Sequence, residues 1–319
     1  MNPFFITLTA TVVLLLAAVP GYLFTKTKLI GEECISGFSK VLLFVCQPCL
    51  AVYTFGNLDP SVNKAEKLLS LGIFAGLTAL IFAIVLGGAY LVLAKKQKEP
   101  IYRIITIATT FSNSAFFGIP IIEALFPDTS GDLIIYTTIF ALVMNIVGWT
   151  VGSAIISRNV RHISVKKIFV NPPMIGTAVA LLLYVFGVQL SSLWPSLFDM
   201  ITTAARMSSP LSMIILGMRL GTMKLSSLFG DFRIYLTIAV KQFLMPLVAL
   251  GLVLVLPVPR EVAVTFFVIC ATPSASIVLN FSEILGEGQK EAANTVLLST
   301  MLTVVTVPLM MLFLPLLIG

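Results

Sequence analysis

Residues 113–126 read NSAFFGIPIIEALF, and residues 273–286 read PSASIVLNFSEILG. At an offset of 160 residues, Ser-Ala falls on Ser-Ala and Glu123 falls on Glu283. Both stretches lie in long apolar runs, yet each contains a proline, which removes a backbone donor and interrupts a regular helix. Two matching interruptions in one chain predict an internal repeat built around two broken helices.

The composition of the chain is that of a membrane protein. Hydrophobic residues make up 58% of the 319 residues, charged residues make up 11%, and the mean hydropathy is +1.05. Soluble domains carry about a quarter charged residues. At about 20 residues per crossing, the chain has room for about ten membrane helices and none for a soluble catalytic domain. Kinases, nucleic-acid binding proteins and secreted disulfide scaffolds are therefore excluded.

Hydrophobic runs separated by polar residues predict where the ten helices lie. The predicted spans are residues 3–25, 37–57, 68–94, 101–126, 133–156, 171–190, 199–222, 232–256, 261–285 and 292–317. The first run lacks the basic residues that precede the apolar part of a cleavable signal peptide, so we expect it to be a membrane helix.

Basic residues are distributed unevenly between the two ends of these spans. Fifteen of the 20 lysines and arginines fall on the side that follows spans 1, 3, 5, 7 and 9, three fall on the other side, and Arg206 and Lys241 fall within spans. Basic residues are retained on the cytoplasmic side of a membrane. We therefore expect a multi-pass protein of a bacterial-type inner (plasma) membrane, with both termini on the non-cytoplasmic side.

One charged cluster divides the chain into halves. It contains Arg158, Arg161, His162, Lys166 and Lys167. We predict a first five-helix unit over residues 1–157, a short basic cytoplasmic linker over 158–170 and a second five-helix unit over 171–319. Because five is an odd number, two such repeats must lie in inverted orientation, a plan found in many secondary transporters.

Polar residues accompany both interruptions. Unwound backbone survives in a membrane only where it is buried in protein or lines a wet cavity. The residues around the two breaks are therefore candidates for a substrate site, and the alternative is a pair of packing kinks. These candidates are Ser112, Asn113, Ser114, Pro120, Pro273, Ser274, Ser276 and Asn280.

Five stretches of the chain resemble the auxin efflux carrier family, which includes bacterial malate and malonate permeases and the plant PIN carriers. They are FSNSAFFGIP at 111–120, NPPMIG at 171–176, PLSMIILG at 210–217, KQFLMP at 241–246 and the region 272–308. They occur in family order and cover nearly the whole chain. The resemblance is to the family and not to any one member.

This resemblance implies an all-helical integral membrane protein of the elevator type. Ten helices would form two inverted repeats, with helices 1, 2, 6 and 7 as a scaffold and helices 3–5 and 8–10 as a mobile transport domain. The broken helices 4 and 9 would cross at the centre. A homodimer through the scaffold is compatible with this plan.

Two residues are candidates for binding a carboxylate. The resemblance places Asn113 where auxin carriers contact the substrate, and an amide at the start of a half-helix favours an anion; the alternative is a simple helix cap. It places Arg206 where the plant carriers have an asparagine. A guanidinium clamps a carboxylate with two parallel bonds, which favours a more strongly anionic substrate. Alternatively, the long side chain of Arg206 reaches the outer surface.

Three further charged residues are candidates for coupling or charge pairing. Lys241 lies about 15 Å into the membrane at 1.5 Å per residue from Asp231, so it needs a partner. It could pair with an acidic residue, attract an anion, titrate during transport or serve the structure. Glu123 and Glu283 are candidates for proton coupling, although a solvated carboxylate near a helix end is the more ordinary interpretation.

Other chemistries find little support in the sequence. Residues 46–49 read CQPC inside an apolar span, where a kink at Pro48 explains them better than a redox pair does. His162 is the only histidine, and the chain has neither a nucleotide-binding loop nor an evident nucleophile–base pair. We therefore expect no metal, no cofactor and no enzymatic activity.

The sequence thus predicts a secondary transporter of organic anions, such as malate, malonate or auxin-like acids, that works by alternating access. Its partners would be the small anion and the lipid bilayer, and not a nucleic acid. Two alternatives remain open: a sodium-coupled carrier of the bile-acid type, and a membrane sensor that binds the same ligands without transport. Sodium dependence would favour the first, and binding without counterflow would favour the second.

Overall fold

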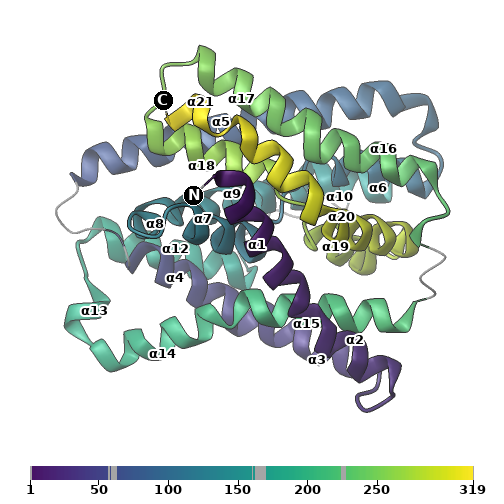
Figure 1. Ribbon diagram of the computed structural model, residues 1–319, viewed down its shortest axis with the longest axis horizontal. Helices are drawn as coiled ribbons and strands as arrows, with labels where there is room; N and C mark the ends of the chain where they lie inside the picture. Colours follow the sequence, from purple (N-terminus) through teal and green to yellow (C-terminus); the bar gives the residue numbers. More distant parts are fainter. Residues whose placement is uncertain are drawn as a thin grey trace.

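The computed structural model describes residues 2–56, 58, 63–159, 161, 170–223 and 228–318, and this part of the chain is all-helical (Figure 1). Six helical segments are long and apolar enough to cross a membrane: Pro3–Lys26, Cys34–Gly56, Lys64–Lys96, Ser130–Ser157, Phe232–Val255 and Gln289–Ile318. Shorter apolar helices are Ser114–Leu125 and Pro172–Val185. Most of the predicted basic linker, including His162, Lys166 and Lys167, lies outside the described residues.

Each of the ten predicted spans contains helix, and spans four and nine are each divided into two helices. The first half contains α1 (Pro3–Leu16), α2 (Ala18–Lys26), α3 (Cys34–Val41), α4 (Gln47–Gly56), α5 (Lys64–Leu93), α6 (Pro100–Ala108), α7 (Ile119–Leu125), α8 (Ser130–Leu133), α9 (Ile135–Val147) and α10 (Ser153–Ser157). The second half contains α12 (Pro172–Val185), α13 (Leu190–Leu193), α14 (Pro195–Arg206), α15 (Ser208–Thr222), α16 (Phe232–Ala239), α17 (Met245–Val255), α18 (Arg260–Ala271), α19 (Ile277–Leu285), α20 (Gln289–Met310) and α21 (Pro315–Ile318).

Local sequence explains where several helices begin. The side-chain oxygens of Asn2, Asn63 and Asp231 each accept a hydrogen bond from the backbone N–H two residues later, at the starts of α1, α5 and α16. Such caps satisfy N–H groups that have no partner within the helix. Proline occupies the start of α6 and α12, where its missing N–H costs nothing.

Three π-helical turns each end two residues before a proline. They are η1 (Leu42–Cys46), η3 (Ser114–Gly118) and η7 (Val240–Leu244), which precede Pro48, Pro120 and Pro246. A proline ring clashes with the carbonyl group of the preceding turn, and a wider turn relieves that clash without ending the helix. A fourth π-turn, η4 (Gly148–Gly152), continues α9 into α10.

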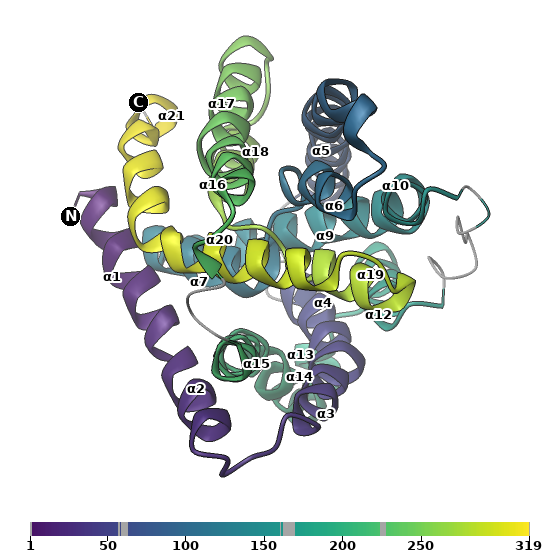
Figure 2. The ribbon, with the colours of Figure 1, turned by 90° about the vertical axis from the view of Figure 1, so that its right-hand side faces the viewer.

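The helices form two groups (Figure 2), and α1 of one group packs against α7 and α20 of the other. In one group, α15 packs along α2, and α12 and α14 pack against α4. The α2–α15 contact is very close, because a Cβ atom on Gly217 would lie 1.8 Å from the carbonyl oxygen of Ala18. In the other group, α5 packs against α9, and α17 packs against α18.

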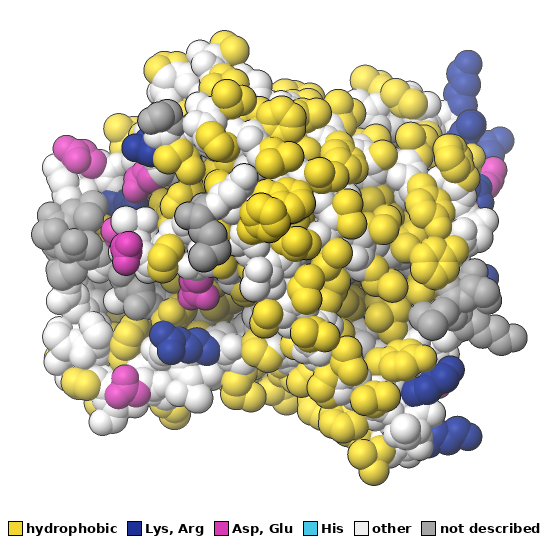
Figure 3. Space-filling view, viewed as in Figure 1, with side chains coloured by type: hydrophobic (Ala, Val, Ile, Leu, Met, Phe, Trp, Pro, Cys, Tyr) yellow, Lys and Arg dark blue, Asp and Glu magenta, His cyan; other side chains and the backbone are white. Residues whose placement is uncertain are grey.

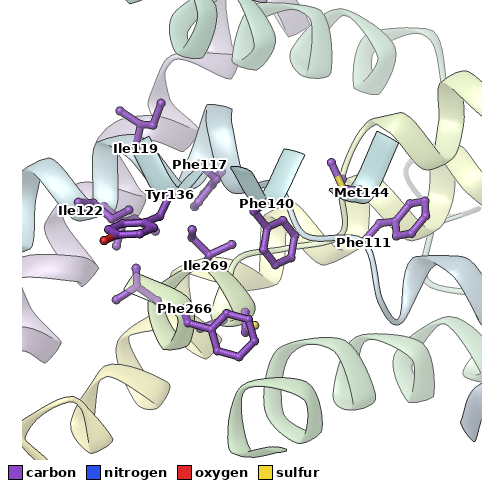
Figure 4. Packing of buried hydrophobic residues seen from close by; sticks show 14 of the residues in the cluster. Phe111, Phe117, Ile119, Ile122, Tyr136, Phe140, Met144, Phe266 and Ile269 are labelled. Carbon is purple, nitrogen blue, oxygen red and sulfur yellow. The ribbon is translucent and has the colours of Figure 1, made fainter. Parts of the chain in front are cut away.

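The surface and the core both fit a membrane environment. Hydrophobic side chains cover the middle of the molecule in Figure 3, while lysines and arginines gather mainly at its right-hand end. Large apolar side chains are strongly exposed, among them Val92 and Val255, each 82% exposed. In Figure 4, Phe117, Phe140 and Ile269 from η3, α9 and α18 lie in one buried cluster beside the broken helices. The protein is therefore a multi-pass membrane protein.

Candidate functional site

The two helix breaks pair with each other through their backbones. Residues 109–113 separate α6 from η3, and residues 272–276 separate α18 from α19. The N–H of Asn113 donates to the carbonyl of Pro273 at 2.8 Å, and the N–H of Ala275 donates to the carbonyl of Phe111 at 2.8 Å. These bonds form an isolated antiparallel bridge between Ser112 and Ser274. The bridge satisfies backbone groups that would otherwise be unpaired within the membrane.

Buried polar side chains support this bridge from behind. The hydroxyl of Ser274 donates to the carbonyl of Ala108 at 2.9 Å, and the backbone N–H of Ser274 donates to Ser299 Oγ at 2.8 Å. Gln242 Nε2 on η7 donates to the Ser299 carbonyl at 2.8 Å. The crossing is therefore fixed by α6, η7 and α20 together.

Lys241 lies at the same crossing. Its side chain is fully buried, and Nζ donates to the carbonyl oxygens of Cys270 and Thr272 at 2.9 and 2.8 Å. These carbonyls belong to the last turn of α18 and to the break that follows, where helical acceptors lack partners. The sequence suggested an acidic residue as one possible partner of Lys241. Among the described residues, its hydrogen-bond partners are instead two backbone carbonyls.

A cavity of about 180 Å³ lies beside the bridge. Three helical segments begin at its wall, because Asn113, Asn171 and Ser276 line it and are the caps of η3, α12 and α19. Helix starts carry partial positive charge and favour anions. The predicted residues that line the cavity are Ser112, Asn113, Ser114, Ser276 and Asn280.

Asn113 is a lining residue whose side chain is free to bind a ligand. Its side chain is 5% exposed, makes no capping hydrogen bond to η3 and has no hydrogen-bond partner among the described residues. A buried amide normally has partners for its donors and acceptor. Its backbone N–H is held by Pro273, so the side chain is positioned while its amide group remains available.

Aromatic and amide side chains complete the cavity wall. Trp149 on η4 meets Phe281 on α19 edge to face, with ring centroids 4.7 Å apart, and both line the cavity. Gly148 permits this contact, because a Cβ atom there would lie 2.4 Å from the Phe281 ring. Asn171 Nδ2 donates to Asn145 Oδ1 at 3.0 Å, and both of these amides also line the cavity. The cavity thus has an apolar aromatic side and a polar side.

Arg206 does not line this cavity. It lies with Glu123 and Pro120 around a second cavity of about 430 Å³, and its guanidinium stacks over Tyr53 at 5.9 Å from the ring centroid. Leu50 and Ala115 line both cavities and therefore lie between them. The structure thus separates Arg206 from Asn113, although the sequence suggested that both contact one substrate.

Arg219 is a residue of the cavity that sequence reasoning missed. It lies in the last turn of α15, and Ser212, Ile215 and Leu216 share its cavity-lining face. Arg219 Nη1 lies 2.6 Å from Glu283 Oε1 at the end of α19. The spacing of Ser212 and Arg219, seven residues apart on one helix, is the sequence signal that points to this shared face.

The comparison with known families agrees with the membrane fold. A family model described as membrane transport protein matches residues 6–164 and 156–311, which cover nearly the whole chain. This match confirms the resemblance to the auxin efflux carrier family. No curated protein matches the chain.

Proposed function

The chain belongs to the membrane transport protein family, and from this premise we propose that it is a secondary transporter of organic anions that works by alternating access. The observation that carries the proposal is the chemistry of the cavity at the crossing. Its polar wall combines the unpartnered amide of Asn113 with the starts of η3, α12 and α19, and no aspartate or glutamate among the described residues lines it. Amide donors and helix starts on a wall without a carboxylate of its own favour a carboxylate ligand over a cation.

The size and the apolar side of the cavity indicate the class of anion. A volume of about 180 Å³ suits a small organic acid such as malonate, malate or an auxin-like acid. The aromatic side formed by Trp149 and Phe281 offers contact to the carbon skeleton of such a molecule.

Two five-helix repeats in inverted orientation, residues 1–157 and 171–319, are part of this proposal. The two backbone bonds of the bridge support it, because each break gives one N–H and one carbonyl to the other. Two ion pairs support it as well. Lys67 on α5 pairs with Glu261 on α18 at 2.9 Å, and Arg233 on α16 pairs with Glu99 just before α6 at 3.3 Å. An inverted repeat relates α5 to α16 and α6 to α18. It therefore relates the first ion pair to the second.

Alternating access would then move α5–α10 and α16–α21 as a transport domain against a scaffold of α1–α4 and α12–α15. The two groups of helices in Figure 2 support this division. The separate cavities on either side of Leu50 and Ala115 support it too, since an alternating carrier needs a closed layer between its two entrances.

The test is uptake of labelled malonate, malate and indole-3-acetate into liposomes that contain the purified protein. Asn113→Asp replaces the amide donors by a negative charge of the same shape. We expect it to reduce anion counterflow at least about tenfold, which corresponds to roughly 1.4 kcal/mol. Asn63→Asp is the matched control, because it adds the same charge at the exposed cap of α5 and an aspartate caps a helix as well as an asparagine does.

The outcomes separate the proposal from its alternatives. Equal counterflow by wild type and Asn113→Asp would remove the cavity from the mechanism. A requirement for sodium would favour the sodium-coupled carrier. Stabilisation of the protein by an anion without any counterflow would favour the sensor.

A further inference from the structure

Arg219 is the only charged side chain among the described residues that line the cavity. Its guanidinium carries a positive charge and five N–H donors in a fixed plane. The electrostatic character of the cavity therefore depends on this one residue, on the scaffold helix α15, together with the three helix starts.

The guanidinium of Arg219 is occupied by a carboxylate of the protein itself. The 2.6 Å contact joins it to Glu283, which follows the cavity-lining residue Asn280 by one turn on α19 but does not line the cavity. The Glu283 side chain is 42% exposed, against 20% for Arg219. Glu283 thus contacts the Arg219 guanidinium from the more exposed side of the pair. Among the described residues, no other side chain accepts a hydrogen bond from Arg219.

We propose that Arg219 binds an anionic group of the substrate, and that Glu283 is an internal competitor which the substrate displaces. This inference rests on the proposed transport of organic anions by the same cavity. The exchange replaces one carboxylate on the guanidinium by another, so the arginine is never left without an anion. The Glu283 side chain is already 42% exposed in the ion pair, so its release uncovers little further surface.

Two separate anchors on the cavity wall imply a preference for substrates with two anionic groups. Asn113 and the helix starts can hold one carboxylate by hydrogen bonds, and Arg219 can hold a second by charge. An acid with a single carboxylate uses one anchor only and leaves Glu283 in place. A dicarboxylate that reaches both anchors displaces Glu283 from Arg219.

A purely structural ion pair is the alternative, and it predicts different behaviour. Exposed ion pairs contribute little to stability, and their loss has no direct effect on a ligand. Removal of a competitor and removal of a binding residue change the affinity for the anion in opposite directions. If Glu283 competes, its neutralisation strengthens anion binding, whereas neutralisation of Arg219 weakens it.

The experiment measures ligand-induced stabilisation of the purified full-length protein by malonate and succinate, and by their monoamides malonamate and succinamate. We expect Arg219→Gln to weaken dicarboxylate binding roughly ten- to hundredfold, the range for loss of a charge-assisted hydrogen bond, and to leave monoamide binding nearly unchanged. We expect Glu283→Gln to strengthen dicarboxylate binding several-fold. Arg219→Lys keeps the charge but loses the planar fork, so its affinity should lie between those of the wild type and Arg219→Gln.

Arg233→Gln and Glu99→Gln are the matched controls. These residues form an ion pair that also lies at the ends of helices, and neither lines the cavity. Their variants show how the removal of a distant positive or negative charge changes dicarboxylate binding. We expect their dicarboxylate affinities to lie within about twofold of that of the wild type.

Three results would overturn the inference. The first is equal weakening of dicarboxylate and monoamide binding by Arg219→Gln. The second is weaker dicarboxylate binding in Glu283→Gln. The third is an increase in Glu99→Gln as large as in Glu283→Gln. In all three cases the wild type still binds and transports anions, so the proposed function stands. If the wild type shows neither anion binding nor counterflow, the proposed function itself is overturned.

Discussion

The backbone N–H of Asn113 donates a 2.8 Å hydrogen bond to the carbonyl of Pro273, and this bond joins two residues that are 160 positions apart in the chain. Each lies in a break between two helices, and the residues beside them complete the bridge. The two breaks are therefore one structural unit and not two independent kinks. The unit holds the Asn113 side chain at the cavity wall without engaging its amide group.

The two serines of the bridge differ in their hydroxyl groups, and we expect their alanine variants to differ in stability. Ser274 Oγ donates to the Ala108 carbonyl at 2.9 Å, whereas Ser112 Oγ is buried with no partner among the described residues. Ser274→Ala should lower the free energy of unfolding by about 1 kcal/mol or more, because it also leaves the carbonyl unpaired. Ser112→Ala should leave it unchanged or raise it slightly.

Thermal unfolding of the two purified variants without ligand measures this difference. Circular dichroism shows whether both retain the helical content of the wild type. Equal losses in the two variants would contradict the assignment of the Ser274 hydroxyl as the one that supports the crossing.

Lys241 lets the structural and the transport roles be separated. Lys241→Met leaves the carbonyls of Cys270 and Thr272 without their donor, at about 1–3 kcal/mol for each unsatisfied group, although it also removes a buried charge. Lys241→Gln keeps two N–H donors without the charge. We expect the midpoint of thermal unfolding to fall more in Lys241→Met than in Lys241→Gln, and counterflow to persist in Lys241→Gln.

The opposite result for Lys241 is equally informative. If Lys241→Gln is as stable as the wild type but shows no counterflow, the charge itself is needed in the transport cycle. The hydrogen bonds from Lys241 to the carbonyls at the end of α18 would then be secondary.

Much of the fold could be predicted from the sequence because a membrane imposes simple rules. The length of an apolar run sets the position of a helix, and each of the ten predicted spans contains one. Proline with neighbouring glycine and polar residues marked the breaks, since such residues are costly in a lipid-facing helix. Asn113 was selected for the same reason, and it lines the cavity.

Contacts between distant residues could not be predicted in the same way. Glu283 lies 64 residues after Arg219, and their contact depends on how α15 packs beside α19. The partners of Lys241 are backbone carbonyls, which every residue possesses and which leave no mark in the sequence. Arg206 lies at the end of α14, where it stacks over Tyr53 and lines a different cavity, and the sequence does not show this tertiary contact.

The sidedness of the protein in the membrane can be measured with reporter fusions. The excess of basic residues predicts that the end of the chain lies outside the cytoplasm and that the linker lies inside. We expect alkaline phosphatase to be active when fused after Ile318 and inactive when fused after Arg161. Green fluorescent protein at the same two positions should give the reverse pattern, and phosphatase activity at both positions would contradict the predicted orientation.

The close contact of α2 with α15 makes Gly217 the most sensitive glycine in that part of the fold. A Cβ atom there would lie 1.8 Å from the Ala18 carbonyl oxygen, so Gly217→Ala must push the two helices apart. Overpacking of this kind costs about 1–3 kcal/mol, and we expect a clear fall in the unfolding midpoint. Gly87→Ala is the matched control, because a Cβ atom at Gly87 in α5 meets nothing within 4 Å. Alanine is the better helix former, so Gly87→Ala should be as stable as the wild type or more stable. A larger loss in Gly87→Ala than in Gly217→Ala would mean that α2 and α15 do not pack this closely in the membrane.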